Sequence, residues 1–105
     1  MEPTEEQIRK LWEKCGFRYT DLYIIYPDNS PRGIEPPIDL NHLWEYAMPK
    51  FGDDLCQIIL QPDSDNSWYC GVVIENKLHI LQEGQGDTPD LALFWACYKA
   101  LGLDK

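Results

Sequence analysis

The sequence lacks any apolar run that approaches the roughly 20 residues a helix needs to cross a membrane. Its N-terminal stretch, MEPTEEQIRKLW, also lacks the basic start and the apolar segment of a signal peptide. These two absences argue against a membrane-spanning or exported protein. We therefore expect a cytoplasmic protein that makes no contact with a membrane.

Basic residues are scarce. The 105 residues contain nine lysines and arginines against 18 acids, which gives a formal net charge of −9. A field of that sign repels phosphate backbones, so direct nucleic-acid binding is disfavoured. What the chain does have is apolar bulk, with 44% hydrophobic and 12% aromatic residues, which is enough to fill one core at this length. We expect one compact α+β domain over residues 1–105.

Residues with the chemistry of a metal site are few and scattered. The two histidines, His42 and His79, have no second histidine or cysteine three or four residues away, the spacing at which ligands share a helical face. The four cysteines form no C-x-x-C pair and are interpreted as reduced, buried thiols. They are Cys15, Cys56, Cys70 and Cys97. We expect no metal and no cofactor.

The sharpest catalytic hypothesis joins a cysteine to a histidine. If Asn76 lies in a two-residue hairpin turn, Cys70 and His79 become diagonal neighbours on one sheet face, and a thiol enzyme needs a histidine beside its cysteine. A buried thiol near a partly exposed imidazole is the commoner arrangement. We therefore expect a protein that is not an enzyme.

In the first half, two helices are predicted on either side of a strand. Thr4 and Gln7 form a capping box, and Gly16 is suited to end the first helix. Residues 17–26, FRYTDLYIIY, are interpreted as one strand covered on both faces, and residues 27–37 as a proline-rich loop without a regular element. Asp39 then caps a helix over residues 40–48, which Pro49 is expected to end.

In the second half, three strands and a helix are predicted. The strands are residues 55–61, 68–75 and 77–82, which should form an antiparallel meander. After a glycine-bearing turn, Thr88 caps a helix over residues 88–101 with Pro89 at its first position. We expect an apolar stripe of this helix to pack on the sheet. The stripe is Leu91, Phe94, Trp95, Tyr98 and Leu101.

The predicted order is α-β-α-β-β-β-α, with helices packed on one mainly antiparallel sheet. Its second part, α-β-β-β-α, resembles the double-stranded-RNA-binding domains. Those domains hold phosphates with lysines at the start of the last helix, and here residues 87–90 read Asp, Thr, Pro and Asp. The resemblance therefore implies a shared order of elements, and such an analogy alone says nothing about function.

Two longer stretches, residues 12–50 and 68–102, resemble small proteins of phages and prophages. The second stretch is similar to the phage ABA sandwich domain family in its Trp-Tyr strand, its turn, its second strand and its Thr-Pro-x-Leu-Ala helix. The matching residues are Trp68, Tyr69, Thr88, Pro89, Leu91 and Ala92. This resemblance implies a phage or mobile-element setting and a helix-sheet-helix architecture, and it implies no catalytic residue.

Acidic residues gather near the predicted loops without the regular alternation of a calcium-binding loop. They are Asp53, Asp54, Asp63, Asp65, Glu83, Asp87 and Asp90. A merely solvated surface is the plain interpretation. The alternative is a negative face that competes with nucleic acid for the basic surface of another protein.

From the sequence we expect a non-catalytic binding protein of a phage or other mobile element. It would bind a host protein with a basic surface in the host cytoplasm, as an anti-defence inhibitor of the anti-CRISPR type. One alternative is a sponge that sequesters a nucleotide immune signal, with Arg18, Arg32 and Lys99 as its candidate cations. A second alternative is a phage structural or assembly component. Homo-oligomerisation stays open.

Overall fold

The computed structural model describes residues 2–63, 66–75 and 79–104, with the backbone alone at residues 79 and 80. In chain order the described elements are α1 (Glu5–Lys14), β1 (Arg18–Tyr19), β2 (Ile24–Ile25), β3 (Pro31–Arg32), α2 (Leu40–His42), the π-helix η1 (Leu43–Ala47), the 3-10 helix η2 (Met48–Asp54), β4 (Leu55–Pro62), β5 (Trp68–Glu75), β6 (His79–Gly86) and α3 (Pro89–Ala100). They form two antiparallel three-stranded sheets, β1-β2-β3 and β4-β5-β6. The α+β class and the order of the last five predicted elements are confirmed.

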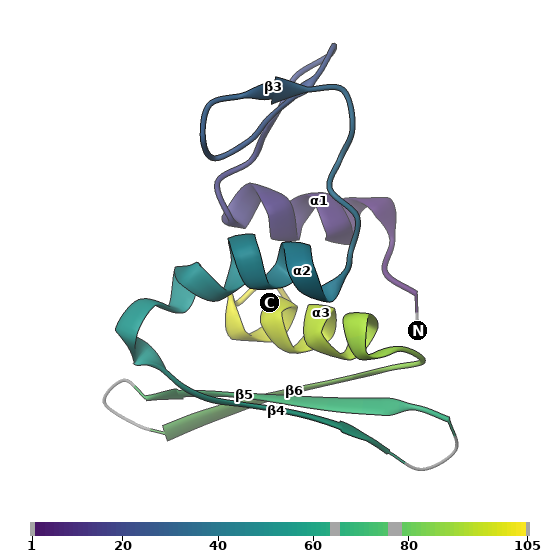
Figure 1. Ribbon diagram of the computed structural model, residues 1–105, viewed down its shortest axis with the longest axis vertical. Coiled ribbons are helices and arrows are strands. Elements are labelled where there is room, and N and C mark those ends of the chain that lie inside the picture. The colour runs from purple at the N-terminus through teal and green to yellow at the C-terminus, as the bar shows by residue number, and fades with distance from the viewer. Residues whose placement is uncertain (1, 64–65, 76–78, 105) are drawn as a thin grey trace.

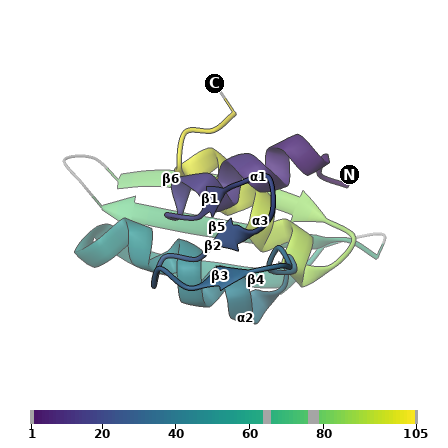
Figure 2. The same cartoon turned by 90° about the horizontal axis from the view of Figure 1, so that it is seen from above.

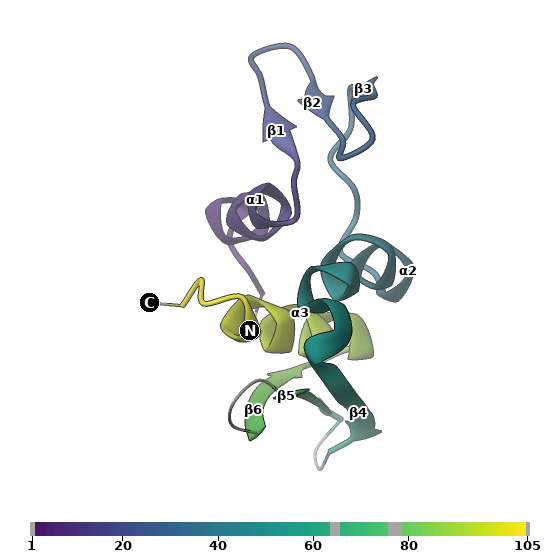
Figure 3. The same cartoon turned by 90° about the vertical axis from the view of Figure 1, so that its left-hand side faces the viewer.

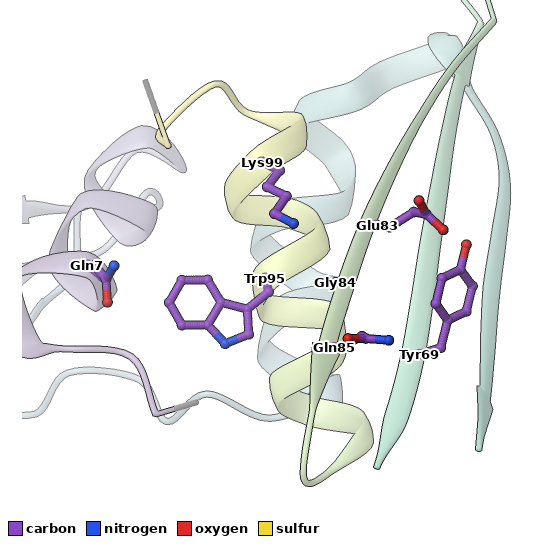
Figure 4. A pocket seen from close by; sticks show the side chains of 7 residues that line it. All are labelled: Gln7, Tyr69, Glu83, Gly84, Gln85, Trp95 and Lys99. Carbon is purple, nitrogen blue, oxygen red and sulfur yellow. The ribbon is translucent and has the colours of Figure 1, made fainter. Parts of the chain in front are cut away.

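Helix α3 lies between the larger sheet and the other two helices (Figure 1). Side chains on most sides of α3 are therefore buried, among them Leu93, Phe94 and Cys97. The prediction of one stripe packed on the sheet is wrong in this respect. Trp95 is only partly buried, and its indole points toward α1, away from the strands (Figure 4).

The described helices all lie on one side of β4–β6 (Figure 3). The helix-sheet-helix layering that the phage-family resemblance implies is therefore not the arrangement seen. We call the other side of the sheet the open face. By strand register it carries Gln57, Ile59, Gln61, Tyr69, Gly71, Val73, Leu81, Glu83 and Gln85.

Two glycines let α3 approach the sheet closely. A Cβ atom on Gly84 would lie 2.3 Å from the carbonyl oxygen of Ala92 and 2.4 Å from the amide nitrogen of Ala96. A Cβ on Gly86 would lie 2.5 Å from Cβ of Leu91. Both glycines belong to β6, so the sequence-based end of this strand at residue 82 and the turn placed after it are wrong.

Helix α1 begins and ends where its sequence predicts. The Thr4 hydroxyl accepts from the amide of Gln7 at 3.2 Å, and the Gln7 side chain accepts from the amide of Thr4 at 2.9 Å. Gly16 has a φ of 107°, a left-handed conformation that glycine adopts without strain. The buried face of the helix presents Leu11 and Trp12 to the core.

The single strand predicted over residues 17–26 is a hairpin instead. Strands β1 and β2 pair through Arg18 with Ile25 and Tyr19 with Ile24. Between them the Thr20 hydroxyl donates to the carbonyl of Tyr23 at 2.6 Å and accepts from its amide at 3.0 Å. This side-chain bonding to the backbone closes a turn, and the alternating pattern of apolar residues does not reveal it.

The proline-rich segment over residues 27–37 contains β3, which pairs with β2. The prediction that it holds no regular element is therefore wrong. Side chains attach the segment to its surroundings. The Tyr26 hydroxyl donates to the carbonyl of Ile34 at 2.9 Å, the Tyr19 hydroxyl donates to the Glu35 carboxylate, and Arg32 lies 4.2 Å from the centre of the Tyr26 ring.

The second helix continues through Pro49, contrary to expectation. Asp39 caps it as predicted, because its carboxylate accepts from the amide of His42 at 2.8 Å. The helix then changes to the π form over η1 and to the 3-10 form over η2. Pro49 falls in the first turn of the 3-10 segment, where a missing N–H leaves no helical hydrogen bond unmade.

Candidate functional site

A groove of about 710 Å³ follows the outer edge of β6. Strand β6 pairs with β5 and is an edge strand, with β4 at the opposite edge of the sheet (Figure 2). Residues from four elements line the groove, and we call it the β6 groove (Figure 4). They are Gln7, Tyr69, Glu83, Gly84, Gln85, Trp95 and Lys99.

The helical wall of the β6 groove is formed by α1 and α3. Trp95 and Lys99 stand four residues apart on α3 and so lie on one helical face. The Trp95 ring is held by edge contacts with Phe94, at 5.0 Å between ring centroids, and with Tyr98, at 5.6 Å. Gln7 faces it from α1, where the capping box fixes the glutamine side chain. The tryptophan is therefore presented at a defined position.

On the sheet side, Tyr69 and Glu83 form a hydrogen-bonded pair. Glu83 lies opposite Gly71, and a Cβ on that glycine would be 2.8 Å from the Tyr69 hydroxyl oxygen. The tyrosine ring thus lies over Gly71 to reach the carboxylate. The hydrogen bond with Glu83, with burial as the second cause, raises the pKa of Tyr69 to about 12.

At the end of the sheet, a hydrogen bond connects the β6 groove to Asp63, one of the predicted acidic residues. Gln85 donates from its Nε2 to the Asp63 carboxylate at 3.0 Å. Asp63 follows β4, and Asp87 follows β6 at the same end, where α3 begins with Asp90 in its first turn. Asp63 and Asp87 are exposed and Asp90 is partly buried.

The remaining acids of the predicted set are placed elsewhere. Asp53 and Asp54 end η2, and the eight residues of β4 separate them from Asp63, a span of about 25 Å at the rise of a strand. Asp65 lies outside the described residues. The structure therefore places Asp63, Asp87 and Asp90 at one end of the sheet, with Glu83 farther along β6, and it leaves Asp53 and Asp54 at the opposite end of the sheet.

The hypothesis of a catalytic Cys70 and His79 pair is wrong in its geometry. Cys70 lies opposite Gly84 in the register, whereas His79 lies opposite Glu75. The two backbone positions are thus separated by five residues along the strands, about 17 Å. Burial also raises the pKa of the Cys70 thiol to about 11, which disfavours the reactive thiolate.

The other cysteines and His42 have structural surroundings. Cys15 and Cys97 are buried as expected, but Cys56 is exposed, which the sequence did not predict. His42 lies with its Nδ1 atom 2.7 Å from the Asp39 carboxylate at the start of α2. Across residues 2–63, 66–75 and 79–104, no three histidine, cysteine or acidic side chains come together as a metal site would require. In the same part of the chain, no helix has the length and apolar character to span a bilayer.

Of the three cations considered for nucleotide binding, the β6 groove contains Lys99 alone. Arg32 instead covers the Tyr26 ring and lies 3.8 Å from the Asp28 carboxylate, and Arg18 is exposed in β1. Sequence reasoning missed Gln7 and Gln85 and assigned Trp95 to the core. The one sequence signal for the β6 groove was the run of polar residues and glycines after residue 81, which forms the rest of β6.

No protein-family model, curated protein or solved structure matches the chain.

Proposed function

We propose that this protein is a non-catalytic binding protein that inhibits a host nucleic-acid-binding protein by occupying its basic surface. The observation that carries the proposal is the β6 groove itself, which combines a fixed tryptophan with Glu83 and includes Gln85, whose side chain donates to the Asp63 carboxylate. Aromatic anchors surrounded by complementary charge are typical of protein interfaces. The phage origin, the anti-defence role of the anti-CRISPR type and the host cytoplasm as location rest on the sequence resemblance.

The distribution of charge supports this choice of surface. Nine of the 18 acids but only three of the nine bases lie in residues 51–105, the half that forms β4–β6 and α3. Opposite charge on a partner would accelerate the encounter and make the binding sensitive to salt. The Debye length is about 10 Å at 0.1 M salt and becomes shorter at higher ionic strength, so added salt should weaken this attraction.

The test is a pull-down from host lysate at about 50 mM and 500 mM salt. We expect the parent protein to retain a basic nucleic-acid-binding protein at the lower salt and to lose most of it at the higher. The double variant Asp63→Lys with Asp87→Lys should lose the partner at both. The matched control, Asp53→Lys with Asp54→Lys, makes the same change of charge at the other end of β4 and should retain it.

Two results would contradict the proposal. One is recovery of no basic nucleic-acid-binding protein at either salt. The other is equal loss of the partner in both double variants, because net charge alone, without a specific surface, would then explain the binding.

A nucleotide sponge is the second candidate, favoured by one observation. Trp95 and Lys99 share the β6 groove, and its volume of about 710 Å³ lies within the roughly 300–1,000 Å³ of small-molecule sites. Glu83 in the same groove opposes a phosphate. Thermal unfolding with cyclic nucleotides and ADP-ribose derivatives separates the two functions. A melting temperature that rises with ligand concentration supports the sponge. An unchanged melting temperature contradicts it.

A further inference from the structure

The two edges of the larger sheet differ in how well they are protected against a further strand. Strand β4 has a register irregularity between Leu55 and Gln57 and carries Pro62 near its end. Bulges and prolines are the usual means by which an edge strand prevents pairing. Strand β6 pairs with β5 residue by residue from His79 to Gly86 without such an irregularity, and its eight residues include no proline or lysine.

The outer side of β6 also borders the β6 groove. Within the described residues β6 pairs with β5 alone, so its outward backbone N–H and C=O groups have no strand partner, and the groove lies along Glu83, Gly84 and Gln85. Rows of such groups bind extended peptides in several domain families by strand addition. The sheet edge and the groove thus offer backbone pairing and side-chain contacts at one place.

We propose that the free edge of β6 binds an extended, basic segment of the partner protein as an added antiparallel or parallel strand. The proposal rests on the proposed function and specifies the part of the partner that is recognised. Successive side chains of such a strand point to opposite sides of the sheet. On the open face they would lie beside Glu83, and on the other side they would meet Trp95.

This geometry selects an alternating sequence. A lysine or arginine on the open face would come close to the Glu83 carboxylate, which lies near the middle of β6. An apolar residue on the helix side would contact the Trp95 ring. The preferred segment therefore alternates basic and apolar residues over about six positions, the usual length of a strand.

A second copy of the chain fits this edge less well than a basic partner. Antiparallel pairing of two β6 strands would bring their central Glu83 residues close together, and like charges facing each other across a sheet are destabilising. Each copy also carries a net charge of −9. The charge of the edge therefore favours a cationic strand from another protein.

The experiment uses the full-length protein and three acetylated, amidated hexapeptides. The first alternates lysine and valine, the second has three lysines followed by three valines, and the third alternates glutamate and valine. Binding is followed by fluorescence titration, and amide hydrogen exchange is measured by NMR along β4 and β6. We expect the first peptide to bind more tightly than the second and the third not to bind. We also expect the outward amides of β6 to exchange at least about ten-fold more slowly in the complex, with those of β4 unchanged.

A conservative variant tests the role of Glu83. Glu83→Gln retains an acceptor for the Tyr69 hydroxyl, removes the charge, and should weaken binding of the alternating Lys-Val peptide by about three-fold. Asp53→Asn, which removes an exposed charge at the far end of β4, should bind like the parent. Equal weakening in both variants would contradict a specific contact at Glu83.

The outcomes separate the inference from the proposed function. Equal binding of the alternating and block Lys-Val peptides, or peptide binding without slower exchange in β6, overturns strand addition. If neither basic peptide binds but the lysate pull-down recovers a basic nucleic-acid-binding protein, the inference fails and the function stands. If neither basic peptide binds and the pull-down also recovers no basic nucleic-acid-binding protein, both the inference and the proposed function are contradicted.

Discussion

Helix α3 and the β1–β3 lobe (residues 18–37) are held in place by different interactions. Six residues of α3 are buried, whereas no residue of β1, β2 or β3 is. The helix is stabilised by apolar contacts on both of its sides. The lobe contributes the buried Tyr26 ring to the core, against Phe17 and Tyr46, and otherwise depends on hydroxyl hydrogen bonds and on Arg32 over that ring. The difference teaches that the α3 and β6 region can present a fixed groove, because its supporting side chains cannot move without opening the core.

Two neighbouring aromatic residues on α3 give the largest expected contrast. Phe94 is fully buried, so Phe94→Ala should lower the free energy of unfolding by about 3 to 5 kcal/mol. Trp95 is only partly buried, and we expect about 1 to 2 kcal/mol for Trp95→Ala. Denaturant unfolding measures both. Equal losses would show that Trp95 is a core residue and not a wall of the groove.

Close approach of α3 to β6 gives the next largest effect. A Cβ at position 84 would collide with backbone atoms of α3, so Gly84→Ala should lower the free energy of unfolding by about 2 to 3 kcal/mol. Gly33 has no atom within 4 Å of an added Cβ, and Gly33→Ala should change it by less than about 0.5 kcal/mol. If Gly84→Ala leaves the free energy of unfolding unchanged, α3 and β6 are farther apart than in this structure.

In the lobe a smaller effect is expected, and it should be local. Tyr26→Phe removes the hydroxyl that donates to the carbonyl of Ile34 at 2.9 Å and should cost about 1 kcal/mol. Tyr23 is 42% exposed, so Tyr23→Phe is the control and should cost little. Amide exchange should accelerate in residues 31–36 and stay unchanged in α3. Faster exchange in both regions would indicate that the lobe supports the core.

The smallest effect concerns pH. The pKa of Tyr69 is raised from 10 to about 12 because its hydroxyl is hydrogen-bonded to Glu83. The folded state thus favours the protonated hydroxyl, so this contribution to stability is complete below pH 10 and is lost as the pH rises toward 12. Ultraviolet titration should show one tyrosine ionising near pH 12, and Tyr69→Phe should remove that step. If Tyr69→Phe instead removes a step at the ordinary pKa of tyrosine, near 10, the hydrogen bond with Glu83 is contradicted.

The helix caps and the second-half strands were predictable because their signals are local. Thr4, Asp39 and Thr88 each cap the helix that the sequence indicates. The Thr20 turn, the helix through Pro49 and the extent of β6 were not predictable. Their causes are a side chain bonded to the backbone, a shift to π geometry and glycines packed against a helix, which are set by tertiary contacts and leave no periodic pattern.

The candidate site was predictable only in part, for a related reason. The acidic set was found by composition, but its division between the two ends of the sheet depends on where β4 begins and ends. Trp95 was assigned to the core because its position fits a helical stripe. That α3 has a second side facing α1 follows from the stacking of three helices on one face, which the order of elements does not determine.

The two regions are also rival surfaces for a partner. The lobe exposes Leu22 by 86% and Ile34 by 76%, and exposed apolar residues can mark an interface. Its charges are mixed in sign, however, and Arg32 lies 3.8 Å from the Asp28 carboxylate. Leu22→Ser with Ile34→Ser should therefore leave recovery of a basic partner from lysate unchanged.

The most direct test of the central claim is amide hydrogen exchange of the full-length protein with and without the partner recovered from lysate. We predict that exchange slows in β6 and in the first turn of α3, beside Glu83 and Asp87, and stays unchanged in residues 18–37. Slower exchange confined to residues 18–37, with β6 unaffected, would contradict the assignment of the binding surface to the β6 groove.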